Sequence, residues 1–552
     1  MKENHSGTKP FTFLMRILAS AVLVLSLMIA VPVDNSALAA SASTVAAAAE
    51  GPSKEEIVLY VQEHPSNLAS YSAKGLPLNG YTIGYRVKPQ LAQPYVAGAL
   101  SDDELICALN TIKTIRYIAG LPDDIYLSDE YNSLAQASSL VNYVNNKLTH
   151  TPEAPSGMDS SLADKGIEGS KKSNIARTSW QNNTLKWTII HGWMDDSDGD
   201  NAKVLGHRRW ILNPSMGMTG FGSVTGSHGT YNAMYAHDRS NPSASVSGAV
   251  CWPATNTPLS YFGSDAPWSI SLGREISEED VIVTLVKVSS SGSASGQSKV
   301  WTFSKYISDG DFYVNNGGYG EKGCIIFRPS DVGSYDDGDS FYVSVSLGDT
   351  GETMSYTVDF FNLEGYYDPE SPAILSVKLN TLVKPRITWS SVDDADRYKL
   401  YRKTRGGSWK LIADNLTDCI YEDASAGQGI RYYYKITAAR EVKDTIYESD
   451  PSSSKYITVP LSRTRITSAK STARGTNYIK WSSVSKASGY KVYRRTAGSS
   501  KWTLVKTTRS LYFKDTKKTS GRKYEYKVRA YRTYNSYTTY GDYSTIKSIK
   551  TK

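Results

Sequence analysis

Cysteine is scarce in this chain of 552 residues, which contains four, at positions 107, 251, 324 and 419. They lie far apart, in different predicted modules, and form no C-x-x-C pair or other metal-ligand spacing. A paired-cysteine metal site is therefore excluded, and a chain of this length can bury enough apolar surface to fold without cross-links. We expect four free thiols, buried or partly buried.

Short catalytic motifs are missing as well. The sequence has no G-x-S-x-G nucleophile elbow and no H-E-x-x-H metalloprotease motif. It shows no LPXTG-type ending and no apolar C-terminal tail, so covalent sorting to a cell wall is not expected. A chemical site must therefore be assembled by folding, from residues far apart in the sequence.

Long apolar runs are confined to the N-terminal region. Basic residues precede an apolar stretch of 17 residues, Ile17 to Val33, and small residues of the A-x-A type follow it. This order predicts a secretory signal peptide over residues 1–40. The alternative is an uncleaved membrane anchor, for which the stretch is at the short limit. After cleavage no membrane span is expected, and residues 41–100 form a leader and a lead-in segment.

Negative charge is nearly absent from the C-terminal part. Residues 461–552 contain 23 Lys and Arg against 3 Asp and Glu, a local net charge of +20, which leaves −12 for the rest of a chain whose total is +8. A basic segment on an acidic body predicts an anionic partner for that segment. Outside a cell this is an anionic cell-wall polymer or an extracellular glycan or protein. A solvated basic face is the alternative, and nucleic acid is not expected.

Residues 101–250 show helical periodicity first and strand patterns later, which favours an α+β fold. Ser101 and Glu104 form the pattern of a capping box at the start of a first helix, which Gly-Leu-Pro ends. A second helix is expected from Ser128, with an apolar stripe that recurs every three or four residues as far as Leu148.

A loop-rich stretch is expected next, as far as Trp180. A third helix is predicted over Thr184–Asp195 and a short helix or turn over Gly206–Leu212. From Gly220 to Trp252, residues rich in Gly, Ser, Thr and aromatics indicate strands.

Residues 251–365 have no helical period and predict an all-β sandwich. Alternating patterns indicate strands at Val281–Val288, Ile325–Arg328 and Phe341–Leu347, and Ser289–Ser298 is expected to be a flexible loop.

The last part of the chain repeats itself with an offset of 92 residues. The segment ITWSSV at 387–392 matches IKWSSV at 479–484, and tyrosines late in each copy match as well. A period of this length with an early core tryptophan and a late tyrosine is typical of a seven-stranded sandwich. We predict two copies, 368–459 and 462–552, with Trp389 and Trp481 in their cores.

The stretch GHRRWILNP, Gly206 to Pro214, carries the strongest candidate site residues. His207 titrates near neutral pH, and folding could bring it together with His150, which follows the second helix. Arg208 and Arg209 suit an anionic group, although ion pairs with the acidic run DDSDGDN at 195–201 are the more common arrangement. That run lacks the glycine and glutamate of an EF-hand loop, so calcium binding is less favoured.

These motifs resemble the CAP superfamily, also called SCP/TAPS or pathogenesis-related-1 domains. The resemblance runs from about Asp102 to Asp238 and rests on LNTIKTIRYIAGLP, LTH at 148–150, SNIA at 173–176 and GHRRWILNP. It implies a three-layer α-β-α sandwich for residues 101–250. The middle region resembles the immunoglobulin-like segment that follows CAP domains in some Gram-positive secreted proteins. The two repeats resemble fibronectin type III domains.

The resemblance also implies a cleft. In many CAP domains two histidines and two acidic residues line it and can hold a divalent metal. His150 and His207 match the histidines, Ser173 replaces the first acid, and Asp196 matches the second. Zinc would take His150, His207 and Asp196 as ligands, with a further acid from elsewhere. The alternative is that the two histidines hydrogen-bond across the cleft and position loops. The candidate further acids are Glu153 and Glu168.

Three functions follow from these patterns. The favoured one is a secreted protein that binds at the cell surface or outside the cell, with the histidine cleft as ligand site and the repeats for attachment or spacing. The second is an extracellular, peptidase-like hydrolase that uses His207 with Ser173 or with a bound divalent metal such as zinc, and His150 is a further catalytic candidate. The third is a structural spacer protein of the cell wall.

Overall fold

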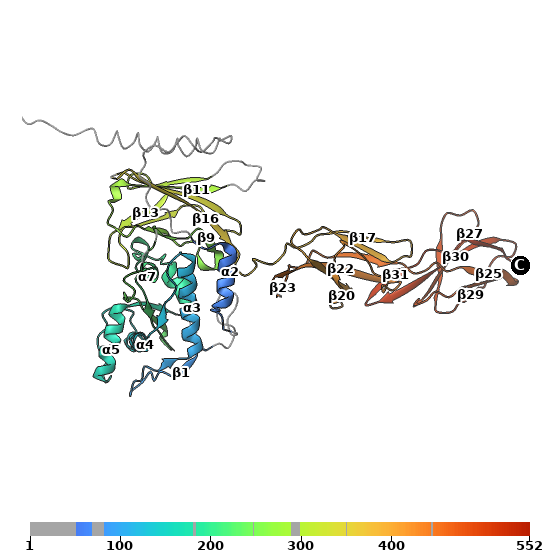
Figure 1. Cartoon of the computed structure of the whole chain (residues 1–552). Helices are drawn as coiled ribbons and strands as arrows, with labels where there is room; N and C mark the ends of the chain where they lie inside the picture. Colours follow the sequence, from blue (N-terminus) through green and yellow to red (C-terminus); the bar gives the residue numbers. More distant parts are fainter. Residues whose placement is uncertain are drawn as a thin grey trace, which may run out of the picture. The chain divides into compact units, whose positions relative to one another are not determined.

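The computed structural model describes residues 51–68, 82–179, 184–244, 246, 248–288, 299–348, 350–442 and 445–552. The predicted signal peptide, the leader up to residue 50, Trp180 and the serine-rich loop 289–298 lie outside these residues. The chain divides into two compact units, Met1–Tyr366 and Tyr367–Lys552, which are described one at a time (Figure 1).

A three-stranded antiparallel sheet forms the centre of the first part of unit 1, in the order β4 (Ser173–Thr178), β7 (Gly229–Tyr235), β6 (Phe221–Gly226). Helix α4 (Asp129–Val144) packs on β6 and β7, with α5 (Ser160–Lys172) beside it. On the opposite face, Asn232 bonds to Thr188 of the π-helix η1 (Thr188–Met194), which also contacts α3 (Asp102–Ile118). The sheet therefore has helices on both faces.

Shorter elements complete this part of the unit. Strands β1 and β2 pair antiparallel, and β3 pairs parallel with β5. The rings of Tyr60 in α2 and Tyr117 in α3 stack with centroids 4.0 Å apart, so the lead-in segment packs on α3. These elements are α2 (Lys54–Glu63), β1 (Tyr85–Val87), β2 (Ala99–Leu100), β3 (Tyr126–Leu127), α6 (Leu185–Trp187), η2 (Asn201–Lys203), α7 (Gly206–Ile211) and β5 (Met218–Thr219).

The start of α3 is as predicted, but its cap differs. Ser101 Oγ accepts a hydrogen bond from the amide of Glu104 at 3.4 Å. The reciprocal bond of a capping box is not made, because the amide of Ser101 donates to the carbonyl of Gly84 at 2.9 Å. The Glu104 carboxylate accepts from the amide of Gly84 at 3.1 Å instead. Glu104 therefore ties the lead-in segment to α3.

The end of α4 falls earlier than its apolar stripe predicts. The helix stops at Val144, and Asn146 takes a φ of 47°, in the left-handed region that often ends helices. Leu148, expected as the last residue of the buried stripe, lies beyond the helix and is 39% exposed.

The loop-rich stretch predicted up to Trp180 is wrong, because α5 and β4 lie there. Two glycines in α5 concealed the helix, since glycine is a poor helix former. Their role is close packing: a Cβ at Gly166 would lie 2.9 Å from the carbonyl oxygen of Ala137, and one at Gly169 would lie 2.1 Å from that of Leu134. The glycines bring α5 against the backbone of α4, at a cost in helix propensity.

The helix predicted over Thr184–Asp195 is present in a different form. Thr184 Oγ1 accepts from the amide of Trp187 at 3.0 Å and starts α6, which continues into the π-helix η1. Such π-helical turns are rare and occur often at functional sites.

Residues 250–361 form the predicted β-sandwich, and its three predicted strands are confirmed. One sheet has the order β13 (Gly310–Asn315), β14 (Cys324–Pro329), β10 (Trp268–Ser271), β8 (Val250–Trp252). The other has the order β12 (Val300–Phe303), β11 (Val281–Val288), β15 (Ser340–Leu347), β16 (Glu352–Phe361), β9 (Asn256–Pro258), with 3-10 turns η3 (Leu259–Tyr261) and η4 (Glu278–Asp280) between strands.

Unit 2 contains the two predicted β-sandwiches, each with two sheets. In the first repeat, β17 (Ile374–Leu379), β18 (Pro385–Trp389) and β21 (Ile420–Glu422) form one sheet. The other contains β20 (Lys410–Leu416), β19 (Arg397–Thr404), β22 (Ile430–Val442) and β23 (Thr445–Glu448), with β24 (Lys455–Val459) also on β22.

The second repeat has the same strand order. Its smaller sheet contains β25 (Ile466–Ala473), β26 (Thr476–Trp481) and β29 (Tyr512–Asp515). Its larger sheet contains β28 (Thr503–Thr508), β27 (Gly489–Thr496), β30 (Lys523–Tyr534) and β31 (Tyr537–Tyr540), with β32 (Lys547–Lys550) also on β30.

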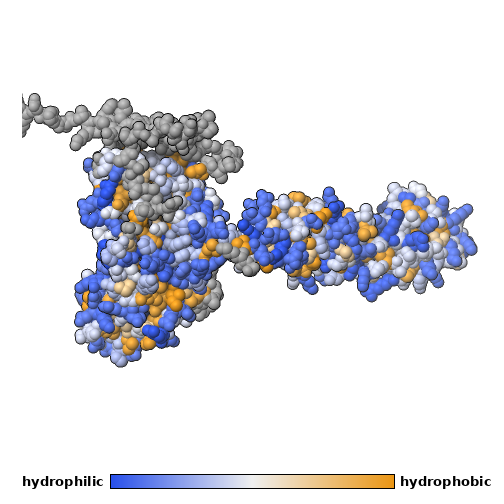
Figure 2. Space-filling model, viewed as in Figure 1, coloured by the Kyte–Doolittle hydropathy of each residue, from blue (hydrophilic) through white to orange (hydrophobic). Residues whose placement is uncertain are grey.

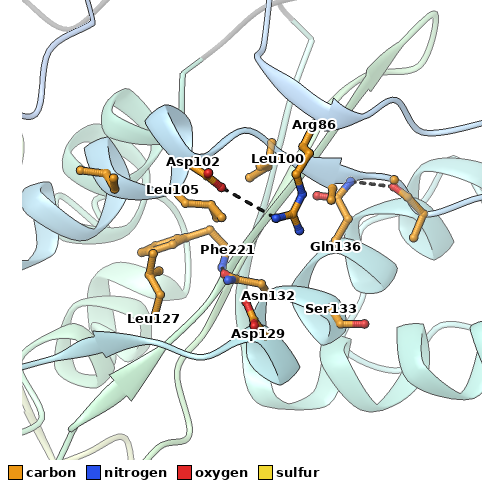
Figure 3. A pocket seen from close by; sticks show the side chains of 14 residues that line it. Arg86, Leu100, Asp102, Leu105, Leu127, Asp129, Asn132, Ser133, Gln136 and Phe221 are labelled. Carbon is orange, nitrogen blue, oxygen red and sulfur yellow. Dashed lines mark hydrogen bonds and ion pairs between the residues drawn. The ribbon is translucent and has the colours of Figure 1, made fainter.

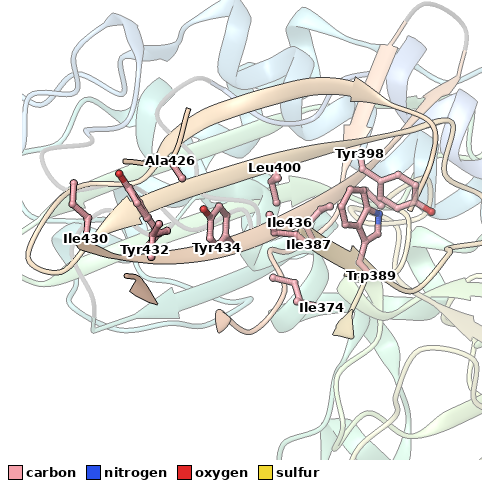
Figure 4. Close-up of a cluster of buried hydrophobic side chains, with 12 residues drawn as sticks. Ile374, Ile387, Trp389, Tyr398, Leu400, Ala426, Ile430, Tyr432, Tyr434 and Ile436 are labelled. Carbon is pink, nitrogen blue, oxygen red and sulfur yellow. The ribbon is translucent and has the colours of Figure 1, made fainter. Parts of the chain in front are cut away.

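The cores of the two repeats match residue by residue. Trp389 and Trp481 are 2% and 1% exposed, as predicted. Figure 4 shows Trp389 beside Tyr398 at one end of the first core, with Tyr434 further along it. All four cysteines of the chain are free thiols, three of them buried and Cys419 half-buried.

Each repeat also buries the same polar group. Tyr434 donates its hydroxyl hydrogen to Asp423 at 2.8 Å, and Arg402 pairs with the same carboxylate. In the second repeat Tyr526 donates to Asp515 at 2.7 Å, and Arg494 pairs with it at 2.8 Å. The repeat in sequence is thus a repeat of one hydrogen-bonded core.

Candidate functional site

A cleft in unit 1 brings together residues from several segments of the chain. Its volume is about 480 Å³. His150 comes from the loop after α4, Thr178 from the end of β4, Trp187 and His191 from the helical segment, and His207 from α7. The two histidines that the sequence paired, His150 and His207, therefore line one cleft.

His207 is held by a buried carboxylate. Its Nδ1 lies 2.8 Å from Asp196 Oδ1, and its backbone amide donates to Asp196 Oδ2 at 3.0 Å. The Asp196 side chain is 1% exposed and that of His207 18%. Because Nδ1 is engaged, Nε2 is the nitrogen that His207 presents to the cleft.

The same carboxylate controls the charge of the ring. Burial opposes a positive charge on His207, but the hydrogen bond and the charge of Asp196, with a contribution from Asp198, outweigh it and raise the pKa of His207 above the usual 6.5. The cleft therefore presents an imidazolium N–H donor over a wider pH range than a free histidine would.

The backbone around the pair adopts an uncommon conformation. Asp196 has a φ of 45° and Leu205, just before α7, a φ of 48°. Leucine rarely takes this left-handed region, so its fully buried side chain must hold the turn. The turn places the first amides of α7 on Asp196, since the amide of Arg208 also donates to it at 3.4 Å.

His191 belongs to the site and was missed from the sequence. Its Nδ1 lies 3.2 Å from Asp195 Oδ2, four residues later on the same helical segment. Its ring lies 5.6 Å from that of Trp187, between centroids. The available signal was the run His191-Gly-Trp-Met-Asp195, which places a carboxylate one helical turn after an imidazole.

His150 is an exposed residue of the cleft rim. Its Nδ1 lies 2.8 Å from the backbone carbonyl oxygen of Ser170, which fixes the ring at the end of α5. A second missed histidine, His237, stacks on Trp210 with centroids 4.2 Å apart. Burial, and then the positive charges of His150, Arg239 and Lys172, lower the pKa of His237.

Ser173 is not brought to His207. Its side chain is buried, and within the described residues its hydroxyl makes no hydrogen bond. Strand β4 alternates its side chains between the two faces of the sheet. The next residue, Asn174, is the one that reaches α7, by donating to the backbone carbonyl of His207 at 3.0 Å.

The donors in the described residues do not present a three-ligand metal site. No three His, Cys, Asp or Glu side chains are grouped there as metal ligands. Asp196 uses both oxygens on His207 and on the first amides of α7, and Glu168 pairs with Lys172 at 2.8 Å. Zinc binding at His150, His207 and Asp196 stays a prediction.

The two arginines of GHRRWILNP are structural. Both are buried, and they donate to carbonyl and side-chain oxygens of the adjoining β-sandwich instead of forming ion pairs with the acidic run. Arg208 reaches the carbonyl of Pro267 at 2.5 Å and the hydroxyl of Ser269 at 3.1 Å. Arg209 reaches Asn315 Oδ1 at 2.7 Å and the carbonyl of Gly317 at 2.6 Å. The pair therefore joins α7 to the sandwich and is not free to bind an anion.

A second hollow of about 660 Å³ lies between α3, α4 and β2. Figure 3 shows the ion pair of Arg86 and Asp102, at 3.9 Å, with Leu105 beside Asp102 and Phe221 below them. The side-chain amide of Gln136 donates a hydrogen bond to the carbonyl oxygen of Ala97 at 2.8 Å. The residues that line this hollow include no histidine or cysteine, so it offers less chemistry than the histidine cleft.

Comparisons with known proteins match only short or weakly superposed parts. No family model matches the chain. Curated relatives include the amylopullulanase of Thermoanaerobacter thermohydrosulfuricus, 41% identical over 56 residues, and that of Thermoanaerobacterium saccharolyticum, 37% identical over 60 residues. These matches cover 10% and 11% of this chain, and the chain spans only 4% and 5% of the length of these relatives.

Solved structures similar to the chain include two fibronectin type III segments. A two-domain segment of chicken tenascin is 13% identical, covers 33% of this chain and 99% of that one, and has a TM-score of 0.28. The FN1–FN3 domains of chicken CNTN1 are 14% identical, cover 52% and 94%, and have a TM-score of 0.19. The sandwich fold of the two repeats rests on their own strand order.

Within the described residues, every helix is too short or too polar to cross a membrane.

Proposed function

We propose that this chain is a secreted CAP-domain protein that acts by binding at the cell surface or outside the cell. The histidine cleft is its ligand site, and the two fibronectin type III-like repeats attach it or hold it at a distance. One observation carries the proposal: a buried Asp196 binds Nδ1 of His207, in a cleft that His150 and His191 also line, which leaves Nε2 for a ligand.

Two observations support the CAP assignment for residues 101–250. A central antiparallel sheet lies between helices on both faces, which is the α-β-α layering that the resemblance implies. Two histidines far apart in the sequence, His150 and His207, line the same cleft.

The chemistry of the cleft suits a ligand with a polar or anionic group. A protonated His207 donates a charge-assisted hydrogen bond from Nε2, and Asp196 keeps the ring in place. Trp187, which is half-buried, offers apolar surface beside it. An aromatic wall with a small number of oriented polar groups is typical of small-molecule and oligosaccharide sites.

A binding experiment tests this proposal. Soluble cell-wall fragments are titrated into the full chain, into His207→Ala and into His228→Ala. His228 is the matched control, because it is a half-buried histidine of the same unit that does not line the cleft. Binding should be lost in His207→Ala and kept in His228→Ala. Equal binding by all three proteins would contradict the proposal.

A hydrolase remains the second candidate, because a carboxylate on Nδ1 and a free Nε2 are also the arrangement of a general base. In this version His207 activates a water molecule, and Ser173 takes no part since its hydroxyl is buried. Release of fragments from intact walls should then fall in Asp196→Asn and stay unchanged in Ser173→Ala. A chain that binds wall fragments and releases none would exclude this candidate.

A further inference from the structure

The second repeat carries an unusual row of cations and rings on its larger sheet. We call it the basic ladder, and its members in order are Arg495, Trp502, Lys527, Tyr543, Arg529, Tyr540 and Lys491. On the face shown in Figure 2, hydrophilic residues dominate unit 2 and apolar residues are scattered among them, so a charge-driven contact is the kind of contact that this unit favours.

Each ring of the ladder has two cations close to it. Lys527 Nζ is 4.5 Å from the ring centroid of Trp502 and 3.8 Å from that of Tyr543. The guanidinium of Arg529 is 4.8 Å from the ring of Tyr543 and 4.0 Å from that of Tyr540. Lys491 Nζ lies 5.3 Å from Tyr540, and the Arg495 guanidinium 4.6 Å from Trp502.

The first repeat keeps part of this row, since Lys403 and Lys435 lie over Trp409, but it places a carboxylate among the cations. Through the offset of 92 residues, Lys491 corresponds to Lys399, Arg529 to Thr437 and Tyr540 to Glu448. Glu448 pairs with Lys399 and also accepts from the hydroxyl of Thr437 at 2.6 Å. In the first repeat the carboxylate of Glu448 therefore neutralises the charge of Lys399. The second repeat has an arginine and a tyrosine at the positions corresponding to Thr437 and Glu448, and no carboxylate at either.

The positive charge of the ladder is not neutralised within the repeat. Only Arg495 has an acidic partner, Glu525 at 2.6 Å; among the residues that the structure describes, Lys491, Lys527 and Arg529 form no ion pair. Burial lowers the pKa of Lys527, and the positive charges of Arg495 and Arg529 lower it further. Crowded like charges favour an external anion.

The spacing of these charges suits a polymer better than a single ion. Lys491 and Arg529 lie opposite each other on neighbouring strands, and Lys527 is two residues from Arg529 on β30. Two residues along a strand span on the order of 7 Å. A ligand with one anionic group on each repeating unit meets several of these cations at once.

The rings argue against a nucleic acid. Proteins that bind single strands stack bases on open aromatic faces. Here Trp502, Tyr543 and Tyr540 each have two cations of the ladder within 5.3 Å of the ring centroid, so a base that stacked on these rings would compete with those cations. The rings instead fix the cations in one row, which lowers the entropy cost of binding.

We infer that the basic ladder binds an anionic extracellular glycopolymer, a chain of sugar or polyol units with a phosphate or a carboxylate on each unit. The inference rests on the attachment role proposed above and names the face that provides it.

The test exchanges the residues at two corresponding positions between the two repeats. The full chain and its Arg529→Thr/Tyr540→Glu variant are measured on immobilised poly(glycerol phosphate), polygalacturonate, neutral dextran and single-stranded DNA at rising salt. The substituted residues are those of the first repeat, so the sandwich should fold, which thermal melts verify. The reciprocal change, Thr437→Arg/Glu448→Tyr, is then added to that variant.

The full chain should bind one or both anionic glycopolymers, release them with salt and ignore dextran. The first variant should bind on the order of tenfold more weakly, because positive charge is replaced by negative charge at the centre of the face. The reciprocal change should restore binding. The poly(glycerol phosphate) and polygalacturonate arms show whether phosphate or carboxylate is preferred.

Two outcomes would overturn the inference: unchanged affinity in the first variant, or tighter binding to single-stranded DNA than to either glycopolymer. If the full chain binds neither glycopolymer, the attachment role fails as well. If it binds them and the variant does so equally, the attachment role stands and only the ladder is wrong.

Discussion

At the scale of single residues, burial decides what each charged group does in this protein. Asp196 is almost fully buried beside His207 and makes that ring a fixed, readily protonated donor. Arg208 is completely buried as well, but its partners are carbonyl and hydroxyl oxygens, so it has a structural role. His207 and Arg208 are adjacent in the sequence, yet the first lines the cleft and the second joins α7 to the β-sandwich.

Replacing Asp196 by Asn should lower the pKa of His207. The hydrogen bond to a charged carboxylate and its attraction are lost, while the burial that opposes protonation stays. Side-chain NMR titration of the histidines measures this directly. Asp200→Asn is the control, since Asp200 is exposed and pairs with Lys203. An unchanged pKa of His207 in Asp196→Asn would refute the role given to Asp196.

The raised pKa also fixes a pH dependence of stability. The folded state holds the His207 proton more tightly than the unfolded state, so this contribution is fully present below the unfolded pKa of about 6.5 and is lost as pH rises through the folded pKa. The difference in free energy of unfolding between wild type and Asp196→Asn should therefore shrink from acidic to alkaline pH.

Replacing Arg208 by Met should lower the free energy of unfolding by about 3 kcal/mol or more, because the carbonyl oxygens of Met194, Asp195 and Pro267 lose a buried donor. Calorimetry of the full chain measures it. The control is Arg86→Met, whose side chain is 66% exposed and which should change stability by less than about 0.5 kcal/mol. Similar losses in both variants would contradict a structural role specific to Arg208.

At the scale of elements, glycine sets how closely the layers pack. A Cβ at Gly222 of β6 would lie 2.3 Å from the amide nitrogen of Gln136 and 2.4 Å from the carbonyl oxygen of Ala135, both backbone atoms of α4. Neither can move aside as a side chain could. The sheet and α4 are therefore in backbone contact at this point.

Gly222→Ala should destabilise unit 1 by about 1–3 kcal/mol or more, because the added methyl group forces the sheet and α4 apart. Chemical denaturation followed by tryptophan fluorescence measures the change. Gly318→Ala is the matched control, since a Cβ there meets no atom within 4 Å. Equal stability of the two variants would show that the close contact does not bear on the fold.

Tyr526→Phe should destabilise the second repeat by about 1–2 kcal/mol, because Asp515 and Asn477 lose the tyrosine hydroxyl in a buried site. Tyr512→Phe, on a side chain of the same repeat that is 50% exposed, should be nearly neutral. Thermal melts of the full chain compare the stability of the two variants through the unfolding transition of unit 2. A neutral Tyr526→Phe would mean that the repeated Arg-Asp-Tyr group does not stabilise the core.

Strands with a strong apolar pattern were predictable from the sequence, and Val281–Val288 has the predicted bounds. The helix α5 was not, because Gly166 and Gly169 serve packing against α4, and a packing partner is invisible in a local pattern. The cleft pair His150 and His207 was predicted from motifs. The part played by His191 was not, since it depends on a π-helix that sequence periodicity does not reveal.

The role of the arginines was also out of reach of the sequence. Arg208 and Arg209 follow an acidic run, and charge proximity favoured ion pairs with it. In the structure they donate hydrogen bonds to oxygens of a β-sandwich that begins about forty residues later in the chain. Charge patterns in sequence predict electrostatic neighbours along the chain but not carbonyl groups brought near by folding.

At the scale of the whole molecule, charge and chemistry are divided between the two units. Unit 1 holds the histidine cleft and unit 2 ends in a repeat with a local net charge of +20. The proposed account gives these parts separate tasks: the cleft selects a ligand, and the second repeat keeps the protein near an anionic surface. Substitutions in one should leave the binding of the other unchanged.

The most direct test of the cleft as ligand site follows the side chains of the histidines by NMR while soluble cell-wall fragments are added to the full chain. The account predicts that the signals of His150, His191 and His207 shift with the ligand, whereas those of His64 and His228, which do not line the cleft, stay in place. Signals that all stay in place, or that shift equally at His64 and His228, would contradict it.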